Sequence, residues 1–132
     1  MKFDDLDARM RVYETAHDHC FIRETYLVIR LDGRSFTRLT KEVHTFERPF
    51  DVRFRDAMIA TTKHLMQPGL RIVYGYTESD EISLAVHRDD QGFGRKLRKL
   101  VPIMAGEASA AFSLALGSHG VFDARPRASD ER

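Results

Sequence analysis

The chain has 132 residues, of which 42% are hydrophobic and 31% are charged, a composition typical of one globular domain. Lys and Arg total 21 against 20 Asp and Glu, so the net charge of +1 provides no global field that would attract nucleic acid. The single cysteine excludes an internal disulfide, and neither a signal peptide nor an apolar run of membrane-spanning length is apparent. We therefore expect a cytoplasmic protein without a membrane partner.

The first part of the chain predicts one helix and one strand. Residues 3–18 carry apolar side chains at helical spacing, which predicts an exposed helix. Residues 24–32 are rich in β-branched and apolar side chains, which predicts a strand. The alternating leucine and isoleucine side chains of this strand should face the core, which leaves Asp32 on the open side of the sheet.

The later elements complete a recognisable order. A short helix near 35–39 is followed by a longer helix that Asp51 should cap and Gly69 should end. The remaining expected elements are strands at 70–76 and 81–86, a helix from about 94 to 116, and a strand at 121–124. Strand, helix, strand, strand, helix, strand is the ferredoxin-like order, so we expect an α+β domain whose antiparallel sheet is backed by two helices.

This topology brings two acidic segments together. Right-handed crossover places strand 81–86 between strands 24–32 and 70–76, so Asp32 should lie beside Asp80 and Glu81. Carboxylate oxygens of this kind hold Mg²⁺ against phosphates. Strand alternation directs Glu81 to the open side and Asp80 inward, but alternation often fails at turns, so the pattern does not rank the two as metal ligands. Solvated turn residues are the alternative interpretation.

Two further motifs have weaker functional interpretations. The basic residues Arg95, Lys96, Arg98 and Lys99 fall where a helix is expected to begin, and the helix dipole disfavours cations there. An anionic partner such as a triphosphate or RNA would account for them, and a solvated helix face is the alternative. The His-Asp-His-Cys sequence at 17–20 lacks a second pair of zinc ligands, so packing or capping is favoured over a zinc site.

Several segments in the same order resemble the tRNA-His guanylyltransferase family, most closely its bacterial-type, guanylyltransferase-like branch. The segments that carry this resemblance are 31–36 (LDGRSF), 74–83 (YGYTESDEIS) and 122–125 (FDAR), together with 11–19 and 94–100.

The resemblance implies a polymerase-palm-like catalytic domain over residues 1–125, with a polar tail at 126–132. It implies addition of GTP to the 5′ end of tRNA in the 3′–5′ direction, as tRNA-His guanylylation or 5′-end repair, with ATP or GTP activating the 5′-monophosphate. Family members are longer and usually tetrameric, so we expect this chain to be their N-terminal catalytic portion and to form a homo-oligomer.

The resemblance also implies roles for individual residues. Asp32, the Gly33 carbonyl and Asp80 would bind two Mg²⁺ ions, and Glu81 would be a further catalytic carboxylate. The residues implied in nucleotide binding are Arg34, Ser35, Phe36, Arg48, Ser79, Lys96 and Lys99. Arg48 stands where eukaryotic members carry a lysine. Arginine keeps the positive charge but cannot play every role of a lysine. Two alternatives are a palm-type nucleotide cyclase and a catalytically incomplete nucleotide- or RNA-binding module.

Overall fold

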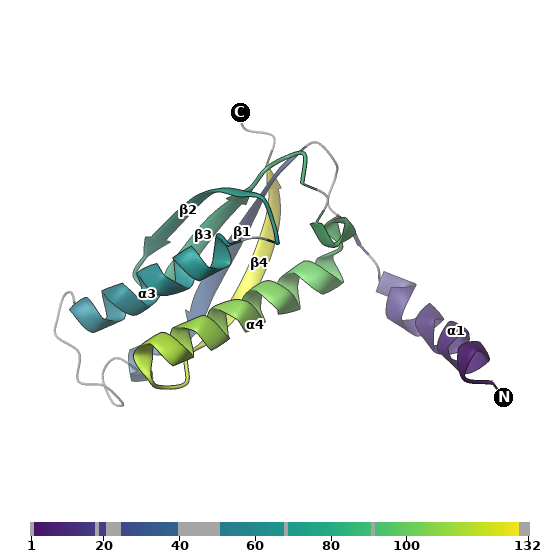
Figure 1. Cartoon of the computed structure of the whole chain (residues 1–132), viewed down its shortest axis with the longest axis horizontal. Coiled ribbons are helices and arrows are strands. Elements are labelled where there is room, and N and C mark those ends of the chain that lie inside the picture. The colour runs from purple at the N-terminus through teal and green to yellow at the C-terminus, as the bar shows by residue number, and fades with distance from the viewer. Residues whose placement is uncertain are drawn as a thin grey trace.

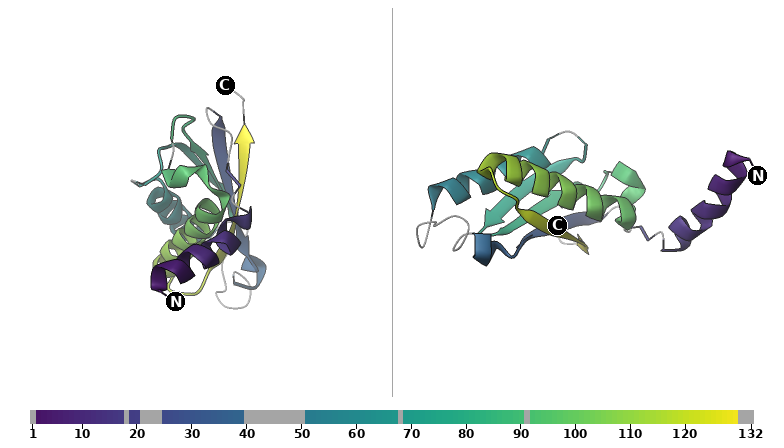
Figure 2. Two further views of the ribbon diagram at one scale, coloured as in Figure 1. Left: turned by 90° about the vertical axis from the view of Figure 1, so that its right-hand side faces the viewer. Right: turned by 90° about the horizontal axis from the view of Figure 1, so that it is seen from below.

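A computed structural model describes residues 2–17, 19–20, 25–39, 51–67, 69–90 and 92–129. In this part of the chain, four antiparallel strands form one sheet, and two long helices cover one of its faces (Figures 1 and 2). The strand order is β2-β3-β1-β4, with β3 between β1 and β2 as the crossover argument predicts. The predicted α+β, ferredoxin-like class is therefore confirmed.

The elements follow the predicted order with shifted boundaries. They are α1 (Phe3–Glu14), η1 (Thr15–His17), β1 (Tyr26–Arg34), α2 (Phe36–Arg38), α3 (Val52–Leu65), β2 (Ile72–Glu78), β3 (Glu81–Val86), η3 (Gly92–Arg95), α4 (Leu97–Leu116) and β4 (Val121–Ser129). The strand predicted at 121–124 is longer than expected, since it runs to Ser129 and pairs with β1 as far as Tyr26. Residues 126–129, expected in a polar tail, continue this strand. An edge strand tolerates the proline and the polar residues there.

The covered face of the sheet is the hydrophobic core. Leu27, Ile29 and Leu31 of β1 are each at most 1% exposed, as their alternation predicts. Ile82, Leu84 and Val86 of β3 are buried in the same way. Strict alternation on the two central strands means that every second side chain is left for the opposite, open face.

A cluster of phenylalanines joins the helices to the end of the sheet. The ring of Phe112 in α4 is fully buried and lies 5.0 Å from that of Phe36, 5.5 Å from that of Phe122 and 6.0 Å from that of Phe54 (centroid distances). These rings come from α2, α3, α4 and β4. Their packing fixes α2, and with it the segment that directly follows the acidic end of β1.

The sequence predicts the start of α3 correctly, but it does not predict the apolar length of α4. The Asp51 side chain accepts a hydrogen bond from the Arg53 backbone N–H at 2.8 Å, which confirms the predicted cap of α3. Contrary to our expectation from sequence, α4 is long and apolar enough to cross a membrane by length and composition. Core helices pass the same test, and α4 packs Leu100, Met104 and Ala108 into the core.

Candidate active site

The acidic segments meet at one end of the open face. Asp32 lies opposite Glu81 of β3 and Asp123 of β4, and Glu81 lies opposite Glu78 of β2. Paired residues of antiparallel strands share a face, so these four side chains form a line across all four strands, which we call the acidic row. Like charges directly opposite each other are destabilising, so this end of the sheet favours a bound cation.

Asp80 lies in the turn between β2 and β3, next to the acidic row. Its carbonyl oxygen accepts a hydrogen bond from the Gly33 N–H at 2.9 Å, which ties the turn to the end of β1. Partial burial raises the pKa of the Asp80 carboxyl, and the negative charges of Asp32 and Glu81 raise it further, against an opposing backbone hydrogen bond. The site therefore disfavours the ionised form of Asp80 unless a cation is near.

The same turn holds Ser79 in an unusual backbone conformation. Its φ is 54°, in the left-handed region that a residue with a side chain adopts at a cost of about 1 kcal/mol or more. Strain of this kind persists where the surroundings hold it, here through the bond between Gly33 and Asp80. The turn breaks strand alternation, which is why the sequence pattern could not place Asp80.

Glu81 differs from Asp80 in having a cationic partner. The Oε2 atom of Glu81 lies 3.0 Å from Nη2 of Arg30, an outward-facing side chain of the neighbouring strand β1. Both side chains are about half exposed, so the pair stabilises the fold little. Asp80 has no such cationic partner among the causes of its pKa shift, and the charges of both Asp32 and Glu81 raise its pKa.

The available donors suit a hard cation that is only partly coordinated by protein. In the described residues, no three His, Cys, Asp or Glu side chains are grouped so that they could hold a metal by themselves. Mg²⁺ commonly takes one or two carboxylates and fills its other positions with water and phosphate oxygens. Asp32, Asp80 and the Gly33 carbonyl fit that donor set.

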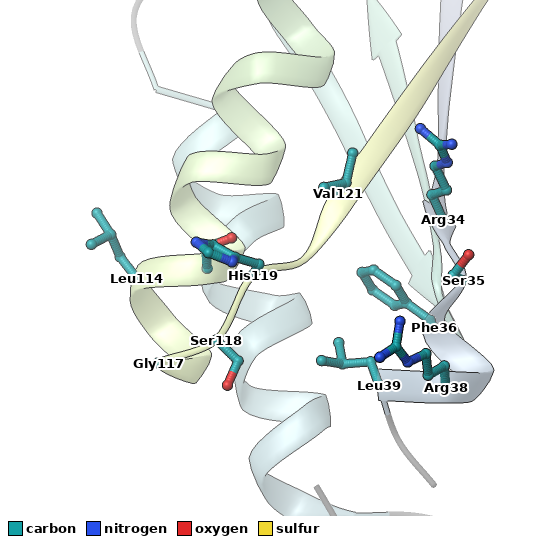
Figure 3. A pocket seen from close by; sticks show the side chains of 11 residues that line it. Arg34, Ser35, Phe36, Arg38, Leu39, Leu114, Gly117, Ser118, His119 and Val121 are labelled. Carbon is teal, nitrogen blue, oxygen red and sulfur yellow. The ribbon is translucent and has the colours of Figure 1, made fainter. Parts of the chain in front are cut away.

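A cavity of about 810 Å³ lies between α2 and the turn that joins α4 to β4 (Figure 3). Arg34, Ser35 and Phe36, which follow Asp32 along the chain, are among its lining residues. Sequence reasoning missed Ser118 and His119 on the opposite wall, because turn residues carry no periodic signal. The volume lies in the range of small-molecule sites, roughly 300–1,000 Å³.

The basic run divides into residues with different surroundings. The hypothesis of an anion site is wrong for Arg95, which is 2% exposed. Its guanidinium donates to the carbonyl oxygens of Asp90 at 2.8 Å, Arg88 at 2.8 Å and His87 at 3.3 Å, so it holds the β3–α4 connection together. Because these carbonyl oxygens satisfy the buried guanidinium of Arg95, no bound anion is needed to explain its position.

Lys96 and Lys99 lie at the opposite end of α4 from the cavity. Lys96 is the N-cap of the helix, whereas the residues of α4 that line the cavity belong to its last turn. A helix of 20 residues is about 30 Å long, so the structure does not bring these lysines to Arg34 and Ser35. Arg48 lies outside the described residues.

Comparisons with known proteins agree with one another. The family model described as "Thg1: tRNAHis guanylyltransferase" matches residues 7–128. The chain is 37% identical over 89 residues to tRNA(His) guanylyltransferase of Schizosaccharomyces pombe, covering 67% of this chain and 34% of that protein. It is 33% identical over 117 residues to the protein R259 of Acanthamoeba polyphaga mimivirus, covering 80% of this chain and 38% of that protein.

Solved structures give the same relationship. A bacterial tRNA(His) guanylyltransferase (Thg1)-like protein in complex with GTP superposes with a TM-score of 0.86 at 27% identity, covering 95% of this chain and 59% of that one. The enzyme from Saccharomyces cerevisiae, at 21% identity and a TM-score of 0.80, shares the fold. The chain thus spans little more than a third of the curated relatives named above and about three fifths of these structures.

Proposed function

The chain belongs to the tRNAHis guanylyltransferase family, and from that premise we propose that it is the catalytic palm of a nucleotidyltransferase. The reaction would add a nucleotide to the 5′ end of tRNA in the 3′–5′ direction. The observation that carries the proposal is the meeting of Asp32 with Asp80 at adjoining strand ends, where the Gly33–Asp80 hydrogen bond holds them together.

Asp32, the Gly33 carbonyl and Asp80 would hold two Mg²⁺ ions, with Glu81 beside them in its pair with Arg30. When bound, Mg²⁺ lowers the pKa of an attacking hydroxyl and stabilises charge on the phosphates. We assign the ligand role to Asp80 in preference to Glu81, because the hydrogen bond from the Gly33 N–H holds Asp80 at the end of β1, whereas Glu81 already pairs with Arg30.

The cavity lined by Arg34, which follows Asp32 by two residues on β1, would take the nucleoside triphosphate, GTP or ATP. Its walls offer the cation of Arg34 and the hydroxyl of Ser35 to the phosphates. Phe36 stays a predicted nucleotide contact, although the residue is 4% exposed and packs in the core. Ser79, in the turn with Asp80, would contact the phosphates from the other side of Asp32. The bacterial relatives solved with GTP and with ATP support this choice of ligand.

Lys96 and Lys99 remain predicted triphosphate contacts, and Arg48 remains a predicted contact during activation. The distance of Lys96 from the cavity along α4 makes these lysines a test of the nucleotide position. If both contact one triphosphate with Ser79, that triphosphate does not lie in the cavity.

The deciding experiment incubates the protein with Mg²⁺, labelled GTP and a 5′-truncated tRNA. We expect label in the RNA, and we expect Asp32→Ala to lower the transfer rate by at least about 100-fold. Asp56→Ala is the matched control, because Asp56 is an exposed aspartate of α3 far from the acidic row in the fold. A cyclic product would instead identify a cyclase, and GTP binding without turnover would identify a binding module.

A further inference from the structure

Two exposed tyrosines on the edge strand β2 have no role in the core. Tyr74 is 60% exposed and Tyr76 is 49% exposed. Between them, Gly75 faces the helices, where an added Cβ would lie 2.6 Å from Sδ of Met66 and 3.2 Å from Cγ2 of Thr62. Helix α3 thus packs so closely on β2 that the large side chains of this strand have to point away from the core.

A local irregularity aligns both tyrosines on the open face. Ile72 and Tyr74 are two residues apart and would share a face in a regular strand. A register shift between them lets Ile72 pair with the buried Val86 while Tyr74 pairs with Ala85 on the other face. Bulges commonly redirect side chains in this way, and this one adds Tyr74 to the face that carries Tyr76.

Arginines share this face with the tyrosines. Tyr76 is in register with Ser83, Ser83 with Arg30, and Arg30 with Arg125. This line of residues is two positions along each strand from the acidic row, a separation of about 7 Å. The side chain of Arg30 is 52% exposed and that of Arg125 is 78% exposed.

The arginines retain donors for a further anion. Arg30 contacts Glu81 at 3.0 Å, and Arg125 lies 3.9 Å from Asp123, a loose pair. A guanidinium has five N–H donors, so one carboxylate contact leaves others for a phosphate oxygen. The face therefore carries both chemistries that single-stranded RNA requires: flat rings for its bases and guanidinium groups for its backbone.

We propose that this open face binds an unpaired RNA segment, with bases stacked on Tyr74 and Tyr76 and phosphates near Arg30 and Arg125. An uncovered sheet with exposed aromatic residues is a common way to bind single-stranded RNA, because every base has a π face. The acidic row repels phosphates, so the backbone lies over the arginines. The inference rests on the proposed function in one respect, namely that the bound segment ends at the acidic row.

The test measures RNA binding directly and needs no turnover. Fluorescence anisotropy of an RNA labelled at its 3′ end measures the affinity, because two of the chain's four tyrosines are the residues that the variants remove. The probe is a 5′-phosphorylated RNA of about six nucleotides, within the range of single-strand binding sites. We expect Tyr74→Ala and Tyr76→Ala each to weaken binding by roughly 5- to 150-fold, whereas Tyr76→Phe retains it.

Matched controls separate this role from exposure alone. Tyr13→Ala removes a tyrosine that is 77% exposed on α1, and it should leave RNA affinity unchanged. Arg30→Gln and Arg125→Gln should each reduce the slope of log affinity against log salt by about 0.7. Unchanged RNA affinity in the Tyr74→Ala/Tyr76→Ala double variant overturns the inference. The inference is also overturned if the double variant binds RNA normally but has a different mass in analytical ultracentrifugation. That result would identify the face as a contact between copies of the chain.

The two proposals can fail separately. If the wild type transfers label to tRNA and the tyrosine variants bind RNA normally, the RNA face is wrong and the proposed function stands. If RNA binding requires the tyrosines but no label is transferred, the proposed function is wrong and the RNA face stands.

Discussion

The two faces of the sheet are built from the same strands and have opposite chemistry. The covered face carries leucine, isoleucine and valine side chains that are almost fully buried. The open face carries the acidic row together with arginines and tyrosines, among them Arg30, Arg125, Tyr74 and Tyr76. Because side chains alternate along a strand, a residue that stabilises the fold and one placed for chemistry can be direct neighbours. Substitutions at neighbouring positions should therefore separate stability from activity.

The largest expected contrast is between Leu31→Ala and Asp32→Ala. Leu31 is fully buried, so its truncation should lower the free energy of unfolding by about 2–5 kcal/mol. Asp32→Ala removes a charge from the acidic row, so the free energy of unfolding should stay equal or rise while nucleotide transfer is lost. Urea denaturation and the labelled-GTP assay measure the two effects. Equal destabilisation by both variants would contradict the division between the faces.

Arg95 sharpens the comparison because it is a charged side chain with a structural role. Replacing it with lysine keeps the charge and loses the planar arrangement of donors that contacts three carbonyl oxygens. Each buried group left without a partner costs about 1–3 kcal/mol, so Arg95→Lys should lower the free energy of unfolding by at least about 2 kcal/mol. Thermal unfolding monitored by circular dichroism measures the change.

Lys99→Gln is the control for Arg95→Lys, since Lys99 is an exposed member of the same basic run. It should change stability by less than about 0.5 kcal/mol, as surface substitutions usually do. A destabilisation as large as that of Arg95→Lys would mean that the whole run is structural.

Sequence patterns predicted the parts of this molecule that depend on periodicity and topology. Alternation in β1 and β3 predicts the buried residues, and the order of elements predicts that Asp32 lies beside Glu81. The cap at Asp51 was predicted because capping is a local interaction between neighbours in sequence. These features follow from repeats of two or 3.6 residues and from the handedness of crossovers.

Features set by single backbone angles or by long-range contacts were not predictable. The left-handed φ of Ser79 and the shift beside Tyr74 break the alternation on which the prediction depends. The burial of Arg95 requires carbonyl oxygens from a preceding turn, and a run of basic letters gives no sign of them. His119 lines the cavity only because β4 returns beside β1.

Asp80→Asn tests whether the site keeps a carboxylate at the expense of stability. The pKa of Asp80 is raised above its ordinary value of 3.8, so the folded state binds the proton more tightly than the unfolded state. The resulting destabilisation is absent below pH 3.8 and develops as pH rises through the folded pKa. The variant should therefore have a slightly higher Tm than the wild type at pH 7, with no difference at pH 3.

Mg²⁺ should reverse this order at neutral pH. A cation bound between Asp32 and Asp80 favours the ionised carboxylate, so Mg²⁺ should raise the Tm of the wild type and leave that of Asp80→Asn nearly unchanged. Differential scanning calorimetry in metal-free buffer, with and without added Mg²⁺, measures the Tm of both proteins. A rise of equal size in the two proteins would place the ion elsewhere.

The smallest expected effect comes from the outer surface of the helical layer. His64 of α3 and Glu107 of α4 lie 2.6 Å apart (Nε2 to Oε2), with 42% and 55% of their side chains exposed. A short distance alone does not make such a pair stabilising, because water screens the charges and two side chains lose freedom. Glu107→Gln should change the free energy of unfolding by less than about 1 kcal/mol and leave transfer intact. A larger loss of stability would show that charges on the helical layer help to hold α3 against α4, and that the division between a structural face and a chemical face is less complete than the strands indicate.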